Sequence, residues 1–62
     1  MATVVRKNKY ARVLSHANGY SYEVQEKVGN KWETLTIFHG AKRGAKKDVA
    51  IHTYNRLTKS KK

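Results

Sequence analysis

Apolar and polar residues alternate through most of residues 10–39, and two glycine-containing turns interrupt the alternation. Asn18-Gly19 and Gly29-Asn30 each fit the two-residue turn of a β-hairpin, in which the central backbone needs positive φ. The pattern therefore predicts three antiparallel strands at residues 10–16, 20–28 and 31–38. Counting outward from both turns sets Val13 opposite Val24, and Val24 opposite Leu35.

This register sorts the side chains of the sheet into two sets, because directly opposed residues of neighbouring strands share a face. One face collects six mostly aliphatic residues, and we expect it to form the core: Val13, Tyr22, Val24, Val28, Leu35 and Ile37. The other collects aromatic, amide, hydroxyl and charged residues: Tyr10, Arg12, Leu14, Glu23, Gln25, Lys27, Trp32, Thr34, Thr36 and Phe38. Such a mixture on an open face is typical of a contact surface.

A single amphipathic helix is predicted after the sheet. Residues 39–44 contain two glycines and two cations and are expected to form a loop. Over residues 45–59, five residues fall on one side at helical spacing and are expected to cover the apolar sheet face: Val49, Ala50, Thr53, Tyr54 and Leu57. The expected fold is α+β: a three-stranded antiparallel sheet packed on one C-terminal α-helix, with residues 10–59 as a single domain, 1–9 as a basic N-terminal arm and 60–62 as a basic tail. An edge strand is the alternative for residues 1–9.

Length and composition limit the protein class. The chain has 62 residues and no cysteine, so one small domain without disulfides or cysteine-based zinc sites is expected. No apolar run is long enough for a membrane span or a signal peptide, and the expectation is a cytoplasmic protein that does not bind membranes.

Net charge indicates the class of partner. The chain carries 14 Lys and Arg against 4 Asp and Glu, for a net charge of +10. Such an excess is typical of proteins that bind a polyanion, nucleic acid above all. A basic protein with no polyanionic partner remains the alternative.

Side chains on the polar sheet face match the groups that read a DNA groove. Arg12 suits a bidentate contact with guanine, and Gln25 suits one with adenine. Thr34 and Thr36 suit a phosphate or a thymine methyl group, Tyr10 and Trp32 suit stacking on sugars or bases, and Lys27 suits a phosphate. Glu23 opposes uniform phosphate affinity, so it either accepts from a cytosine amino group or faces a protein. An ordinary solvated face is the alternative.

Two further basic segments are candidate phosphate contacts. Lys42, Arg43, Lys46 and Lys47 surround the predicted helix start, where backbone amides favour an anion. Arg6 and Lys7 belong to the predicted arm. A solvated loop and a frayed terminus are the respective alternatives.

The order of three strands and a helix resembles the arm-site-binding domains of tyrosine integrases and the plant ethylene-response type of DNA-binding domain. Gly29-Asn30-Lys31-Trp32-Glu33 is similar to the Gly-Lys-Trp hairpin segment of the latter family, and residues 50–56 resemble its helix. This resemblance implies a sheet placed in the DNA major groove. Gly44-Ala45-Lys46-Lys47 is also similar to the last helix of double-stranded-RNA-binding domains, in which a Lys-Lys pair holds phosphates.

Catalysis has little support. His16, His39 and His52 are isolated in the sequence, and no His or carboxylate pair has the spacing of metal ligands. His39, next to Lys42 and Arg43, is the one candidate acid/base group for a small ribonuclease, and a structural histidine is the alternative. We therefore expect no enzyme, no catalytic residue, no metal and no cofactor.

The sequence thus predicts a small nucleic-acid-binding protein that favours duplex DNA over RNA. An open sheet edge allows a monomer or a weak dimer. Size and charge suit a regulatory protein of a phage or mobile element, associated with the nucleoid in a bacterial cell. The alternative is an inhibitor or adaptor that docks on a host protein through Tyr10, Leu14, Trp32 and Phe38, and a double-stranded-RNA binder is the third possibility.

Overall fold

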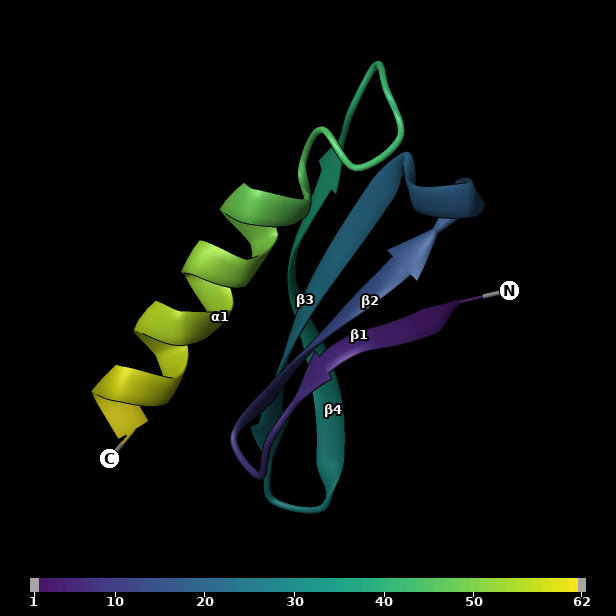
Figure 1. The fold of residues 1–62 in the computed structure, drawn as a ribbon. Helices are drawn as coiled ribbons and strands as arrows, with labels where there is room; N and C mark the ends of the chain where they lie inside the picture. Colours follow the sequence, from purple (N-terminus) through teal and green to yellow (C-terminus); the bar gives the residue numbers. More distant parts are fainter. Residues whose placement is uncertain (1, 62) are drawn as a thin grey trace.

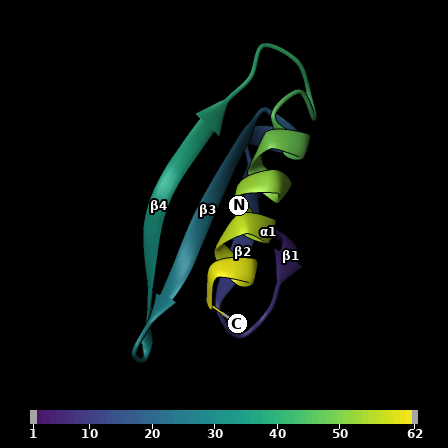
Figure 2. The same cartoon turned by 90° about the vertical axis from the view of Figure 1, so that its left-hand side faces the viewer.

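A four-stranded antiparallel sheet with one C-terminal helix on one face makes up the fold (Figures 1 and 2). The computed structural model describes residues 2–61, with side chains to residue 60, so Met1 and Lys62 of the predicted arm and tail lie outside the described residues. The strands follow in the order β1-β2-β3-β4. Their bounds, with those of the helix and of a 3₁₀ turn, are β1 Thr3–Lys7, β2 Ala11–His16, η1 Ala17–Gly19, β3 Ser21–Val28, β4 Lys31–His39 and α1 Lys47–Lys61. The α+β class is confirmed. No helix among the described residues has the length and apolar character needed to cross a membrane.

The strand β1 corrects the prediction of three strands. Residues expected as an arm pair antiparallel with β2, from Thr3 opposite Ser15 to Lys7 opposite Arg12, with a register shift between Val4 and Arg6. The β-branched residues of β1 favour this extended backbone. Residues 3–7 therefore belong to the sheet. The strand β2 has two neighbouring strands, β1 and β3, where the sequence predicted one.

Asn8 ties the β1–β2 connection to the helix. Its Oδ1 accepts hydrogen bonds from the backbone N–H groups of Tyr10 and Ala11 at 2.8 and 2.9 Å. Its Nδ2 donates to Oγ1 of Thr58 in α1 at 2.7 Å. An Asn side chain that bonds the backbone two or three residues on stabilises a turn, so one residue both closes the β1–β2 hairpin and attaches it to α1.

Both predicted hairpin turns are present. Asn18 and Gly19 have φ of 56° and 96°, and the Tyr20 N–H donates to the Ala17 carbonyl at 3.1 Å. The positive φ values are those that a type I′ turn requires. Gly29 has φ of 61° in the second hairpin. The predicted pairing of Val13 with Val24 is confirmed.

A bulge in β4 overturns the predicted positions beyond Thr34. The register shifts between Val24 and Gln25, so Thr36 lies opposite Val24 and Phe38 lies opposite Tyr22. A one-residue shift turns every later side chain to the other face of the sheet. Ile37 consequently leaves the core and is 46% exposed, and Leu35 is 48% exposed. Thr36 and Phe38 move to the helix-facing side, where Phe38 packs against the core.

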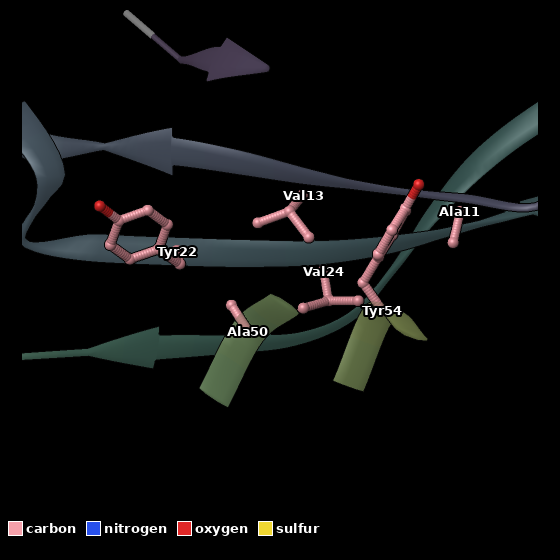
Figure 3. Packing of buried hydrophobic residues seen from close by; sticks show 6 residues of the cluster. All are labelled: Ala11, Val13, Tyr22, Val24, Ala50 and Tyr54. Atoms are coloured by element: carbon pink, nitrogen blue, oxygen red, sulfur yellow. The ribbon is translucent and has the colours of Figure 1, made fainter. Parts of the chain in front are cut away.

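The core lies between α1 and the two central strands. Its buried residues, shown in Figure 3, are Ala11, Val13, Tyr22, Val24, Ala50 and Tyr54. Ala50 and Tyr54 are one helical turn apart and so lie on the same side of α1. Figure 2 shows β4 lying beyond the edge of α1. Val28 in β3 and Val49 in α1, which were expected in the core, are 45% and 38% exposed.

The loop between sheet and helix packs on η1. The Gly44 N–H donates to the Gly19 carbonyl at 2.8 Å, and the Gly40 N–H donates to the Tyr20 carbonyl at 2.8 Å. Gly19 is buried, and a Cβ there would lie 2.8 Å from Cγ of Arg43. These contacts extend the loop to residue 46, so α1 begins two residues later than predicted.

Replacing Val24 tests the position of the core. Val24→Ala is expected to lower the free energy of unfolding by about 2 kcal/mol, because it removes two fully buried methyl groups and leaves a cavity. Val28→Ala, on the same face of β3, is the matched control and is expected to cost less than about 0.5 kcal/mol. Urea unfolding followed by Trp32 fluorescence measures both, and equal losses would place the core elsewhere.

Candidate nucleic-acid interface

The outer face is the side of the sheet that points away from α1. Strand pairing arranges most of it in three transverse rows: Lys7, Arg12, Gln25 and Thr34; then Val4, Leu14, Glu23 and Ile37; then His16, Ser21 and His39. Lys27 and Trp32 form a further pair beside the second hairpin. The predicted reader residues Arg12, Gln25, Lys27, Trp32 and Thr34 thus share one face.

Trp32 carries two cations over its ring. The guanidinium carbon of Arg12 lies 4.4 Å from the centroid of the indole ring, and Nζ of Lys27 lies 4.9 Å from it. A cation over an indole face is attracted by the ring quadrupole. The three side chains come from β2, β3 and β4, so this cluster joins the neighbouring strands. The Trp32 ring thus makes cation–π contacts within the protein, whereas the sequence analysis assigned it to stacking on a base or sugar.

A hydrogen-bonded chain leads from Arg12 to the middle of the outer face. Nε of Arg12 donates to Oε1 of Gln25, and Nε2 of Gln25 donates to Oε2 of Glu23 at 2.8 Å. Thr34 donates its hydroxyl to the same oxygen of Glu23. His16 Nε2 lies 2.8 Å from Oε1 of Glu23. Both carboxylate oxygens are therefore engaged by other residues of the outer face.

Glu23 is held in its ionised form. The hydrogen bond from the Thr34 hydroxyl is the main cause that lowers the pKa of Glu23 below its ordinary value of 4.5. The bonds and charge of His16 and the amide of Gln25 act in the same direction, while burial opposes them. An ionised carboxylate only accepts hydrogen bonds, so His16 donates through Nε2. Glu23 is only 9% exposed, and its charge is satisfied inside the protein.

The four acidic residues are distributed unequally over the molecule. Glu26 lies opposite the core residue Ala11 on one side and opposite Glu33 on the other. Both glutamates are therefore on the helix-facing side of the sheet. Asp48 lies in the first turn of α1. Among the residues that the structure describes, Glu23 is thus the single acidic side chain on the outer face, and it is buried. The charges that this face presents to solvent are positive.

The predicted phosphate contacts fall into separate places. Lys42, Arg43 and Lys46 lie in the sheet-to-helix loop, and Lys47 begins α1. This basic loop lies at the opposite end of the sheet from the hairpin between β3 and β4 (Figure 1). In β1, Lys7 shares the outer face with Arg12, whereas Arg6 is paired with the core residue Val13.

Two candidates of the outer face are placed on the opposite side of the sheet from the sequence prediction. Thr36 and Phe38 lie on the helix-facing side because of the bulge. Tyr10 precedes β2, and its carbonyl accepts from the N–H of Lys27, the residue that it was predicted to oppose, at 2.8 Å; Nζ of Lys9 lies 5.1 Å over its ring. Leu14 is buried. The four residues that were predicted to dock on a host protein, Tyr10, Leu14, Trp32 and Phe38, therefore do not form one exposed patch.

Sequence reasoning missed the contacts among the candidates themselves. It paired Arg12 with Gln25, and Gln25 with Thr34, but assigned each side chain to a base or phosphate. Cross-strand partners lie within hydrogen-bonding reach of each other. The predicted register already placed a guanidinium, an amide and a hydroxyl in one row and a carboxylate in the next. This arrangement was the available signal that these side chains bond one another.

His39 and a hollow along α1 are two further features of the surface. Oγ of Ser21 lies 2.8 Å from Nδ1 of His39 at the exposed end of the outer face. Within residues 2–60, no group of three or more His, Asp or Glu side chains is placed to hold a metal ion. A hollow of about 280 Å³ lies along α1, lined by Thr53, Arg56, Leu57 and Ser60, and none of these residues belongs to the outer face.

Acid titration tests the state of Glu23. Because folding lowers the pKa of this carboxyl, its ionised form stabilises the protein above pH 4.5, and that stabilisation is lost as the pH falls through the folded-state pKa. Glu23→Gln is expected to lose less unfolding free energy on acidification than the unsubstituted chain. Urea unfolding at successive pH values measures this, with Glu33→Gln, which removes a carboxyl outside the hydrogen bonds of Glu23, as the comparison variant. An unchanged acid dependence in Glu23→Gln would contradict the assignment.

Comparisons with other proteins give no further assignment. No protein-family model matches the chain. The searches of curated proteins and of solved structures also gave no match. The functional assignment therefore depends on the geometry and charge of the outer face.

Proposed function

We propose that this protein binds nucleic acid, duplex DNA in preference to RNA, through the outer face of its sheet. The observation that carries the proposal is the sorting of charge. Lys7, Arg12 and Lys27 share this face, and its one carboxylate is buried among hydrogen-bond donors. Surfaces of one charge sign attract a polyanion and release its counterions on binding.

The dimensions of a sheet suit the major groove of B-DNA. That groove admits a small β-structure whose side chains meet base edges, while cations at its margins meet phosphates. Arg12 lies in β2, a central strand, and is suited to a base edge or a phosphate. Lys7 in β1, an edge strand, and Lys27 beside the second hairpin are suited to the backbone on either side.

Two observations favour duplex DNA over other nucleic acids. The ring of Trp32 carries Arg12 and Lys27, so it is not a free platform on which single-stranded bases stack. The major groove of A-form RNA is too deep and narrow for side chains to read. A broad cationic sheet face therefore suits the groove of B-DNA.

The basic loop provides a second contact in this proposal. Lys42, Arg43 and Lys46 are exposed, and the loop is held by backbone hydrogen bonds to η1. The long dimension of the molecule is 32 Å, about the length of one helical turn of duplex DNA. In this proposal, a duplex along the outer face is long enough to reach the end of the sheet at which the basic loop lies.

Binding across a salt series tests the proposal. Fluorescence anisotropy with labelled duplex DNA, duplex RNA and single strands is expected to show tightest binding to duplex DNA. The slope of log affinity against log salt should be about −4 to −8, because each neutralised phosphate contributes about −0.9. Lys27→Ala should make this slope shallower by about one.

Lys59→Ala is the matched control, since it removes the same charge from an exposed position of α1. It is expected to leave the slope nearly unchanged. Equal effects of the two substitutions would show that binding follows net charge rather than the outer face. Absence of binding to every nucleic acid at low salt would reject the proposal.

A further inference from the structure

A buried carboxylate at the middle of a cationic face needs a physical explanation. Burying an ionised group is costly unless it is paired and hydrogen-bonded. Glu23 has three partners, His16, Gln25 and Thr34, and all of them lie on the outer face. Its hydrogen bonds hold no part of the core, so the residues that it orders are those proposed to meet nucleic acid.

Glu23 determines which way the Gln25 amide points. A carboxylate accepts hydrogen bonds and donates none, so it must face the NH₂ end of the amide. Nε2 of Gln25 accordingly lies 2.8 Å from Oε2 of Glu23. The carbonyl end, Oε1, is thereby directed at Arg12 and accepts from its Nε. Reversing the amide would oppose a carbonyl to a carboxylate and an NH₂ group to a guanidinium.

Arg12 is restrained at two points as a result. Its Nε is bonded to Gln25, and its guanidinium group lies over the Trp32 ring. Neither contact uses a hydrogen atom of the two terminal nitrogens, and no other side-chain hydrogen bond of Arg12 is found within residues 2–60. A planar guanidinium held by Nε and by stacking presents its terminal N–H groups as a preformed fork, which lowers the entropy lost on binding.

We propose that Glu23 is a positioning residue that, through Gln25, orients Arg12 toward a ligand with two adjacent acceptor atoms. Two groups of duplex DNA offer that chemistry, the O6 and N7 edge of guanine and a backbone phosphate. The inference rests on the proposed function and changes one part of it. Gln25 serves Arg12 and is no longer available to read adenine.

If Glu23 has this role, removing its charge changes the affinity for nucleic acid in the direction opposite to that expected from charge alone. Removing a negative charge from a cationic face should strengthen the binding of a polyanion. If Glu23 positions Arg12, its removal weakens binding, because Arg12 loses its orientation. Glu33→Gln changes the net charge by the same amount on the helix-facing side, so it isolates the effect of charge alone.

The probes are a 20-base-pair DNA duplex rich in G·C pairs and the same duplex with 7-deazaguanine, which lacks the N7 acceptor. Glu23→Gln is expected to bind the unmodified duplex about tenfold more weakly than the unsubstituted chain, within the range that one bidentate contact gives. Glu33→Gln is expected to bind as tightly as the unsubstituted chain or slightly more tightly. Gln25→Ala, which breaks the chain of hydrogen bonds while keeping the carboxylate, should reproduce the loss.

The modified duplex identifies the acceptor. If Arg12 meets guanine, the unsubstituted chain loses about tenfold on the 7-deaza duplex, and Glu23→Gln binds both duplexes equally. If Arg12 meets a phosphate, the modification has no effect, and Glu23→Gln lowers the salt slope by about one. Either result supports the positioning role.

The Nε–Hε signal of Arg12 in the free protein provides a readout that does not require binding. Its chemical shift is expected to change in Glu23→Gln and in Gln25→Ala and to stay unchanged in Glu33→Gln, with the dispersion of the backbone amide signals confirming that each variant is folded. If Glu23→Gln binds as tightly as Glu33→Gln while duplex binding persists, the inference is overturned and the proposed function stands. If the unsubstituted chain binds neither duplex, both are rejected.

Discussion

The organisation of the outer face depends on the burial of one carboxylate. Glu23 is ionised and nearly inaccessible, and hydrogen bonds from Thr34, Gln25 and His16 compensate for the loss of water around it. Those bonds connect β2, β3 and β4 across the face that α1 leaves open. The amide of Gln25 continues the chain of hydrogen bonds to Arg12, which lies over Trp32, so the carboxylate and one cation of this face belong to the same connected group of side chains.

The two faces of the sheet differ in composition: one contains the hydrophobic core, and the other carries exposed cations. The helix-facing side holds the small core of Val13, Tyr22, Val24, Ala50 and Tyr54, together with the opposed Glu26 and Glu33. The outer side keeps Lys7, Arg12 and Lys27 with no exposed carboxylate. The chain has a net charge of +10, and the outer face takes part in this excess with cations that no exposed carboxylate of the described residues offsets. The basic loop extends that potential to the end of the sheet, where backbone bonds to η1 hold it (Figure 1).

Local turn chemistry made much of this fold predictable. Asn18-Gly19 and Gly29-Asn30 set the hairpins and the pairing of Arg12 with Gln25 and of Gln25 with Thr34, and helical spacing placed Ala50 and Tyr54 on the core. The bulge at Leu35 was not predictable, since apolar and polar residues continue to alternate through it. The alternation also gave no sign that α1 leaves β4 uncovered, as Figure 2 shows. For residues 1–9 the sequence left an edge strand as the alternative to the favoured arm, and the structure shows that strand as β1. The bond from Asn8 to Thr58, which joins the β1–β2 connection to α1, links residues too far apart in the sequence to be foreseen. Most residues assigned to the outer face from the sequence do share that face, but their mutual hydrogen bonds were not foreseen, because each side chain was considered only with an external partner.

The most direct test of the central claim is a map of the duplex contact on the folded protein. In ¹H–¹⁵N NMR spectra recorded during titration with a DNA duplex, the account predicts the largest shifts at Lys7, Arg12, Lys27 and the indole N–H of Trp32. The amides of Glu33 and of the exposed side of α1 around His52 and Asn55 should change little. Shifts confined to α1 and the helix-facing side, with the outer face unperturbed, would contradict the account.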